Sequence, residues 1–381
     1  MKAISTSLSV VASVAIACGG GHDVANRESN APFELRALSY NTALAPGFEP
    51  FTSERKPQIE TALVSLAGQL DLLCVQEYWI GSDFDALASK LADNLPNRFR
   101  QAPRAGSGSC SEHDLNELGG CLAKSCAEQG GVELVGCAQT QCADAIEGID
   151  GGCLGCFLDH LNDHAFSQCA GNAPSDPALF GGAFDVGLLS RYPLSHLDAL
   201  EYDAYFVRGS ALYAQVDVPG LGPVDTFCTH LGSSLGVIPY QGSHGSWDGE
   251  HAYQVAQLMS FIAKKSNGKN PVMVLGDLNM GPGSAGPPAV SAELPLDYQL
   301  VIDSGLVDAV STPVCTTCSD NALRGEGARD LFIDHALLRG FQAEVLADRQ
   351  LQQTFLLDPA QAGTAMNLSD HYALRVELRS R

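Results

Sequence analysis

The sequence is poor in positive charge. Its 381 residues include 22 Lys and Arg against 44 Asp and Glu, which gives a formal net charge of −22. A surface this acidic repels the phosphate backbone of a nucleic acid unless metal ions or a local basic patch intervene, which argues against a dedicated DNA-binding module. The shortage does not exclude an enzyme that cuts a phosphodiester through a bound cation, because that cation would supply the missing positive charge.

Long apolar runs are also scarce. At the N-terminus, MKAISTSLSVVASVAIACGGG, one Lys precedes a short apolar and Ser-rich run that ends in small residues and Cys18. The run is too short for a membrane-spanning helix, which needs about 20 apolar residues. It has the layout of an export signal, so we expect residues 1–17 to be such a signal and the protein to be exported. No other segment of the sequence is long and apolar enough to span a bilayer.

The end of this leader, AIAC, resembles the lipobox of bacterial lipoproteins, in which the Cys becomes the lipid-modified first residue. The resemblance implies lipid attachment at Cys18 and a place in the bacterial cell envelope, with membrane contact through the lipid anchor. Residues 18–32 would then be a Gly-, Asn- and Ser-rich tether. The alternative is an ordinary cleaved signal and a secreted protein.

Cysteine, in contrast, is abundant, with 13 in the chain. Many of them cluster between Cys110 and Cys169. Such a high density of cysteine in an exported chain indicates disulfides. Zinc is the alternative, because two C-x-x-C pairs have ligand-like spacing. We expect a domain over 33–381 that carries a disulfide-rich helical insert at about 105–172. The disulfide candidates are Cys110, Cys121, Cys126, Cys137, Cys142, Cys153, Cys156, Cys169, Cys315 and Cys318.

The cysteine spacing inside the insert predicts two antiparallel helices joined near the Gly-Gly pair at 130–131. Cys126 then lies opposite Cys137, and Cys121 lies opposite Cys142, nested about the turn. The spacing leaves the partners of the other four open: Cys110 and Cys169 would pair with Cys153 or Cys156, or with each other.

Apolar residues at every second position predict strands, and apolar residues at every third or fourth position predict helices. Strands are expected within 33–44, 71–79, 185–194, 210–232, 272–281, 330–338 and 370–378, and helices within 54–70 and 251–265. Strands outnumber helices and the two are mixed along the chain. This order indicates an α+β sandwich of two sheets packed face to face with helices outside.

Polar side chains repeatedly stand where an apolar strand stops. In VMVLGDLNMG, Asp277 and Asn279 are two apart and share a face of the strand. Asp and Asn are also common turn formers, so a simple turn is the alternative there. The repetition favours a site, because carboxylates, amides and histidines recur at Asn41, Glu77, His230, Asp277, Asn279, Asp334, Asp370 and His371.

The motifs LSYN, DLLCVQE, GLLSRYP, TH, GDLN, IDH and SDH follow one another from about residue 35 to 378. In this order they resemble the endonuclease/exonuclease/phosphatase superfamily of metal-dependent phosphoesterases. The resemblance implies a four-layer α/β/β/α sandwich of two mainly antiparallel sheets. It also implies that the chain is an enzyme, a metal-dependent phosphoric ester hydrolase.

The resemblance also implies a metal site. Asn41, Glu77 and Asp370 would bind the metal, and their hard oxygen donors suit Mg²⁺, with Mn²⁺ or Ca²⁺ as alternatives. Asp277 would orient or deprotonate the attacking water, and Asn279 would donate to a phosphate oxygen.

Two histidines complete the implied site. His371 would act as general base or phosphate-binding residue, with Asp334 holding its tautomer. His230 would bind phosphate or protonate the leaving oxygen, and Asp185 is a candidate for its acidic partner. His335 is interpreted as a non-catalytic neighbour that faces the other side of its strand. The expected substrate-binding residues are Asn279, His230 and Arg191.

Two longer stretches, THLGSS…PY…HAYQVAQLMSFI and CSDNALRGEGARDLFIDHALL, look more like neutral sphingomyelinases than like deoxyribonucleases. We therefore expect a phosphodiester substrate, a phospholipid in a sphingomyelinase-like reaction, and no stable protein partner. The alternatives are an extracellular nuclease of the same fold, a phosphomonoesterase on sugar or inositol phosphates, and a surface binding protein on an inactive scaffold. The complete set of site residues argues against the last of these.

Overall fold

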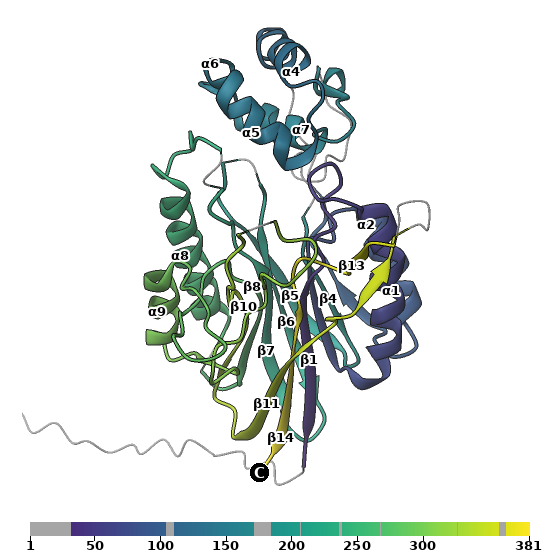
Figure 1. The fold of residues 1–381 in the computed structure, drawn as a ribbon. Helices are drawn as coiled ribbons and strands as arrows, with labels where there is room; N and C mark the ends of the chain where they lie inside the picture. Colours follow the sequence, from purple (N-terminus) through teal and green to yellow (C-terminus); the bar gives the residue numbers. More distant parts are fainter. Residues whose placement is uncertain are drawn as a thin grey trace, which may run out of the picture.

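Two six-stranded sheets pack face to face, with helices against both outer faces (Figure 1). The computed structural model describes residues 32–103, 110–170, 184–205, 207–235, 238–266, 268–325, 327–357 and 363–381. The expected export signal and Cys18 lie outside the described residues. Within the described residues, no helix has the length and apolar character needed to cross a membrane.

The first sheet has the strand order β11-β14-β1-β2-β4-β3. Its strands are β1 (Glu34–Asn41), β2 (Leu72–Gln76), β3 (Asn97–Phe99), β4 (Gly187–Ser190), β11 (Ala343–Gln350) and β14 (Ala373–Ser380). Only the β1–β2 pair is parallel among these described strands. The outer face is covered by α1 (Thr52–Leu66), η1 (Ala67–Gln69) and α2 (Gly81–Leu91).

The second sheet has the order β5-β6-β7-β8-β10-β9. Its strands are β5 (Leu194–Glu201), β6 (Ser210–Val218), β7 (Gly222–His230), β8 (Val272–Asp277), β9 (Val307–Asp308) and β10 (Asp334–Arg339). Here β7 and β8 are the parallel pair of the described strands. The outer helices are α8 (Trp247–Lys265) and α9 (Pro295–Asp303), and a small separate sheet joins β12 (Thr354–Leu356) to β13 (Ala365–Asn367).

The central strands are apolar on both faces because they lie between two layers. Along β8, Met273 and Leu275 enter the core between the sheets, whereas Val272 and Val274 pack toward the outer helices. All four are buried, and each such side chain contributes about 1.5–3 kcal/mol relative to exposure. The expected α+β fold of two mainly antiparallel sheets in a four-layer sandwich is confirmed.

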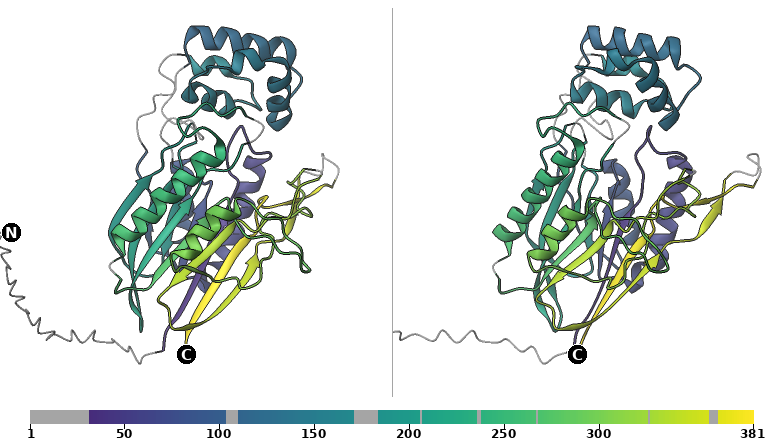
Figure 2. Two further views of the ribbon diagram at one scale, coloured as in Figure 1. Left: turned by 90° about the vertical axis from the view of Figure 1, so that its left-hand side faces the viewer. Right: turned by 60° about the vertical axis from the view of Figure 1, so that its left-hand side comes forward.

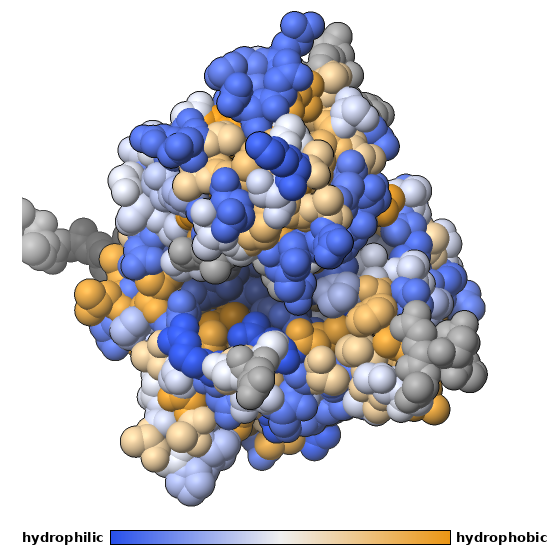
Figure 3. Space-filling model, turned by 45° about the horizontal axis from the view of Figure 1, so that its top comes forward, coloured by the Kyte–Doolittle hydropathy of each residue, from blue (hydrophilic) through white to orange (hydrophobic). Residues whose placement is uncertain are grey.

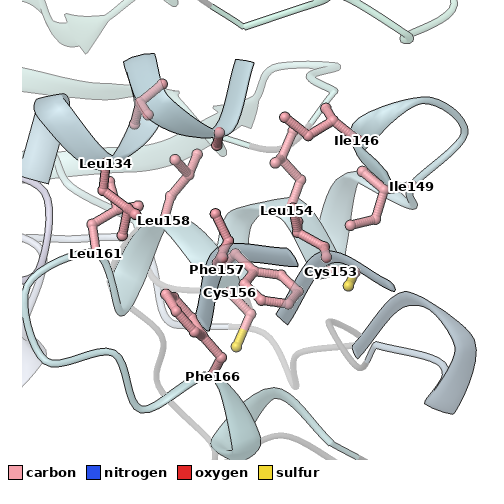
Figure 4. Packing of buried hydrophobic residues seen from close by; sticks show 14 of the residues in the cluster. Leu134, Ile146, Ile149, Cys153, Leu154, Cys156, Phe157, Leu158, Leu161 and Phe166 are labelled. Atoms are coloured by element: carbon pink, nitrogen blue, oxygen red, sulfur yellow. The ribbon is translucent and has the colours of Figure 1, made fainter. Parts of the chain in front are cut away.

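A helical insert lies between β3 and β4 in the chain and stands over one edge of the sandwich in every view (Figures 1 and 2). Its elements are α3 (Glu112–Asp114), η2 (Leu115–Gly119), α4 (Gly120–Ser125), α5 (Gly131–Gln141), α6 (Ala143–Ile146), α7 (Gly151–Asp159) and η3 (Phe166–Cys169). Leu134, Leu154 and Phe157 belong to an apolar core that the insert supplies for the most part (Figure 4). The insert therefore has more helices than the pair that the cysteine spacing predicts.

Four disulfides staple the insert: Cys110–Cys153, Cys121–Cys142, Cys126–Cys137 and Cys156–Cys169. The two middle bonds have the nested arrangement expected about the turn between α4 and α5. Outside the insert, Cys315 bonds Cys318 in an irregular segment. Cys74 bonds Cys228 across the two sheets, a pairing that the sequence analysis did not single out. These bonds leave no thiol among the described cysteines for zinc.

Candidate active site

The polar strand ends meet at the edge of the sandwich that the insert covers (Figure 1). The parallel pairs β1–β2 and β7–β8 end at this edge, and the antiparallel strands β10 and β14 begin there. In the ladder, Asp277 is opposite His230 on one side and Asp334 on the other. Figure 3 shows a hollow with hydrophilic side chains around it between the insert and the sandwich.

Local backbone shape turns two of these side chains out of their strands. Glu77 and Asn279 have positive φ angles of 55° and 48°, each just after a strand ends. Gly276 is required for a different reason: a Cβ there would collide with the Thr229 carbonyl on β7. The GDLN motif therefore combines a close approach of two strands with a bend that presents Asp277 and Asn279 together.

His230 forms the first Asp–His pair of the site. Its Nδ1 bonds the Asp185 carboxylate, which also accepts from the Glu77 backbone N–H at 3.3 Å. The other ring nitrogen, Nε2, is 3.5 Å from Asp277 Oδ2 and 3.2 Å from Asn279 Nδ2. Burial lowers the pKa of His230, but the carboxylates of Asp185, Asp277 and Glu77 outweigh it and raise the pKa to about 10.

His371 forms the second pair. Its Nδ1 is 2.8 Å from Asp334 Oδ2, and its Nε2 is 3.7 Å from Asp277 Oδ2. Burial again lowers the pKa of the ring, but Asp334, Asp370 and Asp277 raise it well above its ordinary value. The neighbouring carboxylates thus favour the protonated form of both imidazoles, and the two Nε2 atoms face the same carboxylate.

Asp277 is that shared carboxylate. It is buried, its Oδ1 accepts from the Asn279 backbone N–H at 2.9 Å, and its Oδ2 accepts from Asn41 Nδ2 at 2.9 Å. Burial raises the pKa of Asp277, and the neighbouring Asp334 carboxylate adds to the rise. Asp277 Oδ2 therefore lies between the two histidine rings, 3.5 Å from His230 Nε2 and 3.7 Å from His371 Nε2.

Beside this centre lies a second group of carboxylates, formed by Glu77, Asp370 and Glu49. Burial raises the pKa of Glu77, and Asp370 adds to the rise. Burial also raises the pKa of Glu49 to about 8, with further contributions from Asp370 and Glu77. The sequence analysis missed Glu49, which lies in an irregular loop after β1 and not at a strand end.

These three carboxylates have the donor chemistry for a divalent cation. Burial is the main cause of the raised pKa values of Glu49 and Glu77, and the nearby Asp370 carboxylate adds to both, so a bound cation would offset part of this cost. All three are partly exposed, so the cation can reach them. Their oxygen donors suit Mg²⁺, Mn²⁺ or Ca²⁺ rather than a soft metal.

Asn41 links the two groups of carboxylates, and its expected role as a metal ligand stays a prediction. Its Nδ2 donates to Glu77 Oε1 at 3.0 Å as well as to Asp277, and its Oδ1 accepts from the Ala43 N–H at 3.0 Å. In this arrangement Asn41 holds the two carboxylates together, and its own oxygen is turned to the backbone.

Arg191 does not join the site, which corrects the expectation that it contacts substrate. It follows β4, which runs antiparallel to β2, with Ser190 opposite Leu72 at the start of that strand. The guanidinium bonds Asp71 at 2.8 Å and the Leu70 carbonyl at 2.7 Å. Arg191 therefore fastens the opposite edge of the sheet.

Comparison with known proteins agrees with this geometry. The sequence model of the endonuclease/exonuclease/phosphatase family matches residues 38–371. No curated protein matches the sequence. Sphingomyelinase C from Streptomyces griseocarneus is similar in structure, with a TM-score of 0.55, 18% identity, and coverage of 91% of this chain and 99% of that chain. A mutant beta toxin from Staphylococcus aureus with bound magnesium ions is also similar in structure. Its TM-score is 0.53 at 13% identity, and the match covers 91% of this chain and 100% of that chain. At these identities the likeness shows the fold.

Proposed function

Because this chain belongs to the endonuclease/exonuclease/phosphatase family, whose members hydrolyse phosphoester bonds, we propose that it is a metal-dependent phosphodiesterase acting on phospholipid. One observation carries the proposal. Two Asp-paired histidines converge on Asp277 beside the carboxylates of Glu49, Glu77 and Asp370. The arrangement offers a proton acceptor, two proton donors and a cation site within one hollow.

In the proposed reaction, Asp277 accepts a proton from the attacking water. The Asn279 N–H and the Asn41 amide fix the Asp277 carboxylate, so its direction is set before substrate arrives. Glu77, Asp370 and Glu49 would hold a divalent cation, which when bound would supply positive charge to neutralise the phosphoryl oxygens.

The two imidazoles act as donors. With Nδ1 bonded to Asp185 or Asp334, each of His230 and His371 presents an Nε2–H to the hollow. One holds a phosphoryl oxygen, and the other gives its proton to the leaving oxygen. Activity then rises with pH as Asp277 ionises and falls at alkaline pH as the histidines lose their protons.

The charge of the molecule supports a phospholipid over a nucleic acid. The chain has a net charge of −22, and the insert above the hollow exposes acids that include Glu112, Glu117, Glu128 and Glu133. This field repels a polyanion but tolerates a single phosphate next to a headgroup cation. The fold of a sphingomyelinase C is in keeping with such a substrate, so the reaction we propose is that of a sphingomyelinase-like phospholipase C.

Export and lipid attachment at Cys18 remain part of the proposal, together with the division into leader, tether and domain. The six disulfides support an oxidising compartment, because they would not persist in a reducing cytosol. Mass spectrometry of the N-terminal peptide from the native host tests the assignment: an acylated Cys18 supports it, and a mature chain that starts elsewhere contradicts it.

The assay that tests the function compares sphingomyelin vesicles, single-stranded DNA and bis(p-nitrophenyl) phosphate. We expect hydrolysis of the lipid and of the small diester, abolition by EDTA and recovery with Mg²⁺. Glu77→Gln should raise the Mg²⁺ concentration needed for half activity by about tenfold or more, because it removes a charged oxygen donor. Faster cleavage of DNA than of lipid would favour the nuclease, and activity that survives EDTA would contradict the metal site.

A further inference from the structure

Two buried histidines outside the reacting centre contact the backbone of the turn that carries Asp277 and Asn279. His251 on α8 approaches the Leu278 carbonyl with Nε2 at 2.9 Å. His335 on β10 approaches the Met280 carbonyl with Nε2 at 2.7 Å. These carbonyls lie on either side of Asn279, and both rings are at most 1% exposed.

Each ring has a carboxylate on its other nitrogen. His251 Nδ1 is 2.7 Å from Asp297 Oδ2 at the start of α9, and His335 Nδ1 is 2.7 Å from Asp308 Oδ2 on β9. A backbone carbonyl can only accept, so the Nε2 of each ring donates to the turn, and the Nδ1 of each ring is hydrogen-bonded to its carboxylate. Four elements are thus tied to one turn by two hydrogen-bonded Asp–His pairs.

The shape of this turn decides where the site residues point. Asn279 has a φ of 48°, its N–H donates to Asp277 Oδ1, and its Nδ2 donates to the Leu231 carbonyl at 2.8 Å. The same Nδ2 is 3.2 Å from His230 Nε2. Rotation of the peptide on either side of Asn279 would move both the Asp277 carboxylate and the amide.

We propose that His251 and His335 are positioning residues of this site, which hold the turn over 277–280 in its working shape by donating to the carbonyls that flank Asn279. The inference rests on the proposed phosphodiesterase function for its consequence, but the contacts themselves do not depend on the substrate. Neither imidazole reaches the hollow, because both of its nitrogens are engaged.

Packing leaves the His335 ring little freedom to leave its place. The rings of Phe332 and Tyr298 have centroids 4.5 Å and 5.2 Å from its own, and the Tyr298 hydroxyl donates to Asp308 Oδ2 at 3.3 Å. A Cβ on Gly281 would collide with the Phe332 carbonyl, so the turn also fits closely at its far end. Burial lowers the pKa of His335, but Asp308 and the Met280 carbonyl outweigh it and raise the pKa.

The test replaces each ring by a side chain that keeps one amide donor, in His251→Gln and His335→Gln. We expect kcat to fall about tenfold or more, because such residues orient the site residues without contacting substrate or metal. KM, and the Mn²⁺ affinity measured by calorimetry, should stay unchanged within about twofold. His244→Gln is the matched control, because that ring pairs with Asp203 at 3.2 Å but lies away from the turn. The inference fails if folded variants keep full kcat, or if the control loses as much.

A second measurement does not need a substrate. In ¹⁵N NMR of the intact chain, Nε2 of both His251 and His335 should carry a proton and show a hydrogen-bonded N–H signal. The Asn279 side-chain amide signal should move in both Gln variants and stay in place in His244→Gln. An Nε2 without a proton in either ring, or an unmoved Asn279 amide, would overturn the inference. Absence of diesterase activity with these signals present would instead count against the proposed function.

Discussion

The sandwich and the insert solve the problem of stability in opposite ways. The sandwich buries apolar side chains on both faces of its central strands and has one disulfide between its sheets. The described insert, over 110–170, supplies most of a single apolar core and has four disulfides. Small units cannot bury enough apolar surface alone, so crosslinks supply part of their stability. The proposed catalytic residues all lie in the sandwich, where regular strands fix their positions.

The two regions are nevertheless joined at the site. The insert core includes Ala45 and Trp79, which follow the Asn41 and Glu77 strands, and Ile238 from the segment after β7. Asn162 of the insert donates to the Gly47 carbonyl at 2.8 Å. The insert therefore covers the loops around the hollow without supplying their chemistry, and variants in each region should separate these two contributions.

The largest loss is expected from the centre of the sandwich site. Asp277→Asn removes the proton acceptor between the two histidines, so kcat on a small soluble diester should fall about 10³-fold, within the range of general base catalysis. Asp303→Asn, at the exposed end of α9, is the control for loss of one acid and should leave kcat unchanged. A folded Asp277→Asn protein with more than a tenth of the original kcat would show that another group accepts the proton.

A smaller loss is expected from the two Asp–His pairs. His371→Ala should lower kcat about 10²-fold, and Asp334→Asn should imitate it because the carboxylate orients that ring. In the other pair, Asp185→Asn should lower the pKa of His230 from about 10, since it removes the carboxylate that raises it most. The alkaline fall in activity should then begin at lower pH. A silent Asp334→Asn beside an inactive His371→Ala would break the pairing.

Residues at strand ends could be predicted from the sequence because the signal is local. Apolar alternation locates the strand, and the first polar residue after it marks the edge, as for Glu77 and Asp277. The same reasoning misplaced Arg191. It follows β4, which is antiparallel to β2 and therefore ends at the edge of the sheet opposite the site, and strand direction cannot be inferred from the local sequence.

Partners supplied by other parts of the chain could not be predicted in this way. Glu49 lies in an irregular loop, and Asp297 and Asp308 reach the two positioning histidines only through the packing of α9 and β9. Cys74 and Cys228 are separated by 154 residues, and only the face-to-face packing of two sheets brings them together. The insert cysteines were accessible to sequence reasoning because α4 and α5 are adjacent in the chain.

Removal of the insert should affect activity much less than any of these substitutions. With a short Gly-Ser linker in place of 110–170, kcat on a small diester should stay within about tenfold, because strands and not the insert hold the site. The melting temperature should fall, since Ala45 and Trp79 lose their apolar cover. Trp79→Ala in the intact chain is the control for the loss of that contact alone. Complete inactivity of a folded, Mn²⁺-binding deletion protein would show that the insert takes part in the chemistry.

The smallest effect on activity is expected from removal of the two disulfides between α4 and α5. The four cysteines to replace by Ala are Cys121, Cys126, Cys137 and Cys142. Loss of native disulfides from a small unit costs about 2–5 kcal/mol, so α4 and α5 should lose protection from hydrogen exchange while kcat changes less than about twofold. The matched variant in the sandwich, Cys74→Ala with Cys228→Ala, should keep β2 and β7 protected, because apolar side chains on both sides of the bond still hold the sheets together. If the strands lost protection and the helices kept it, the sandwich and not the insert would be the region that depends on its crosslinks.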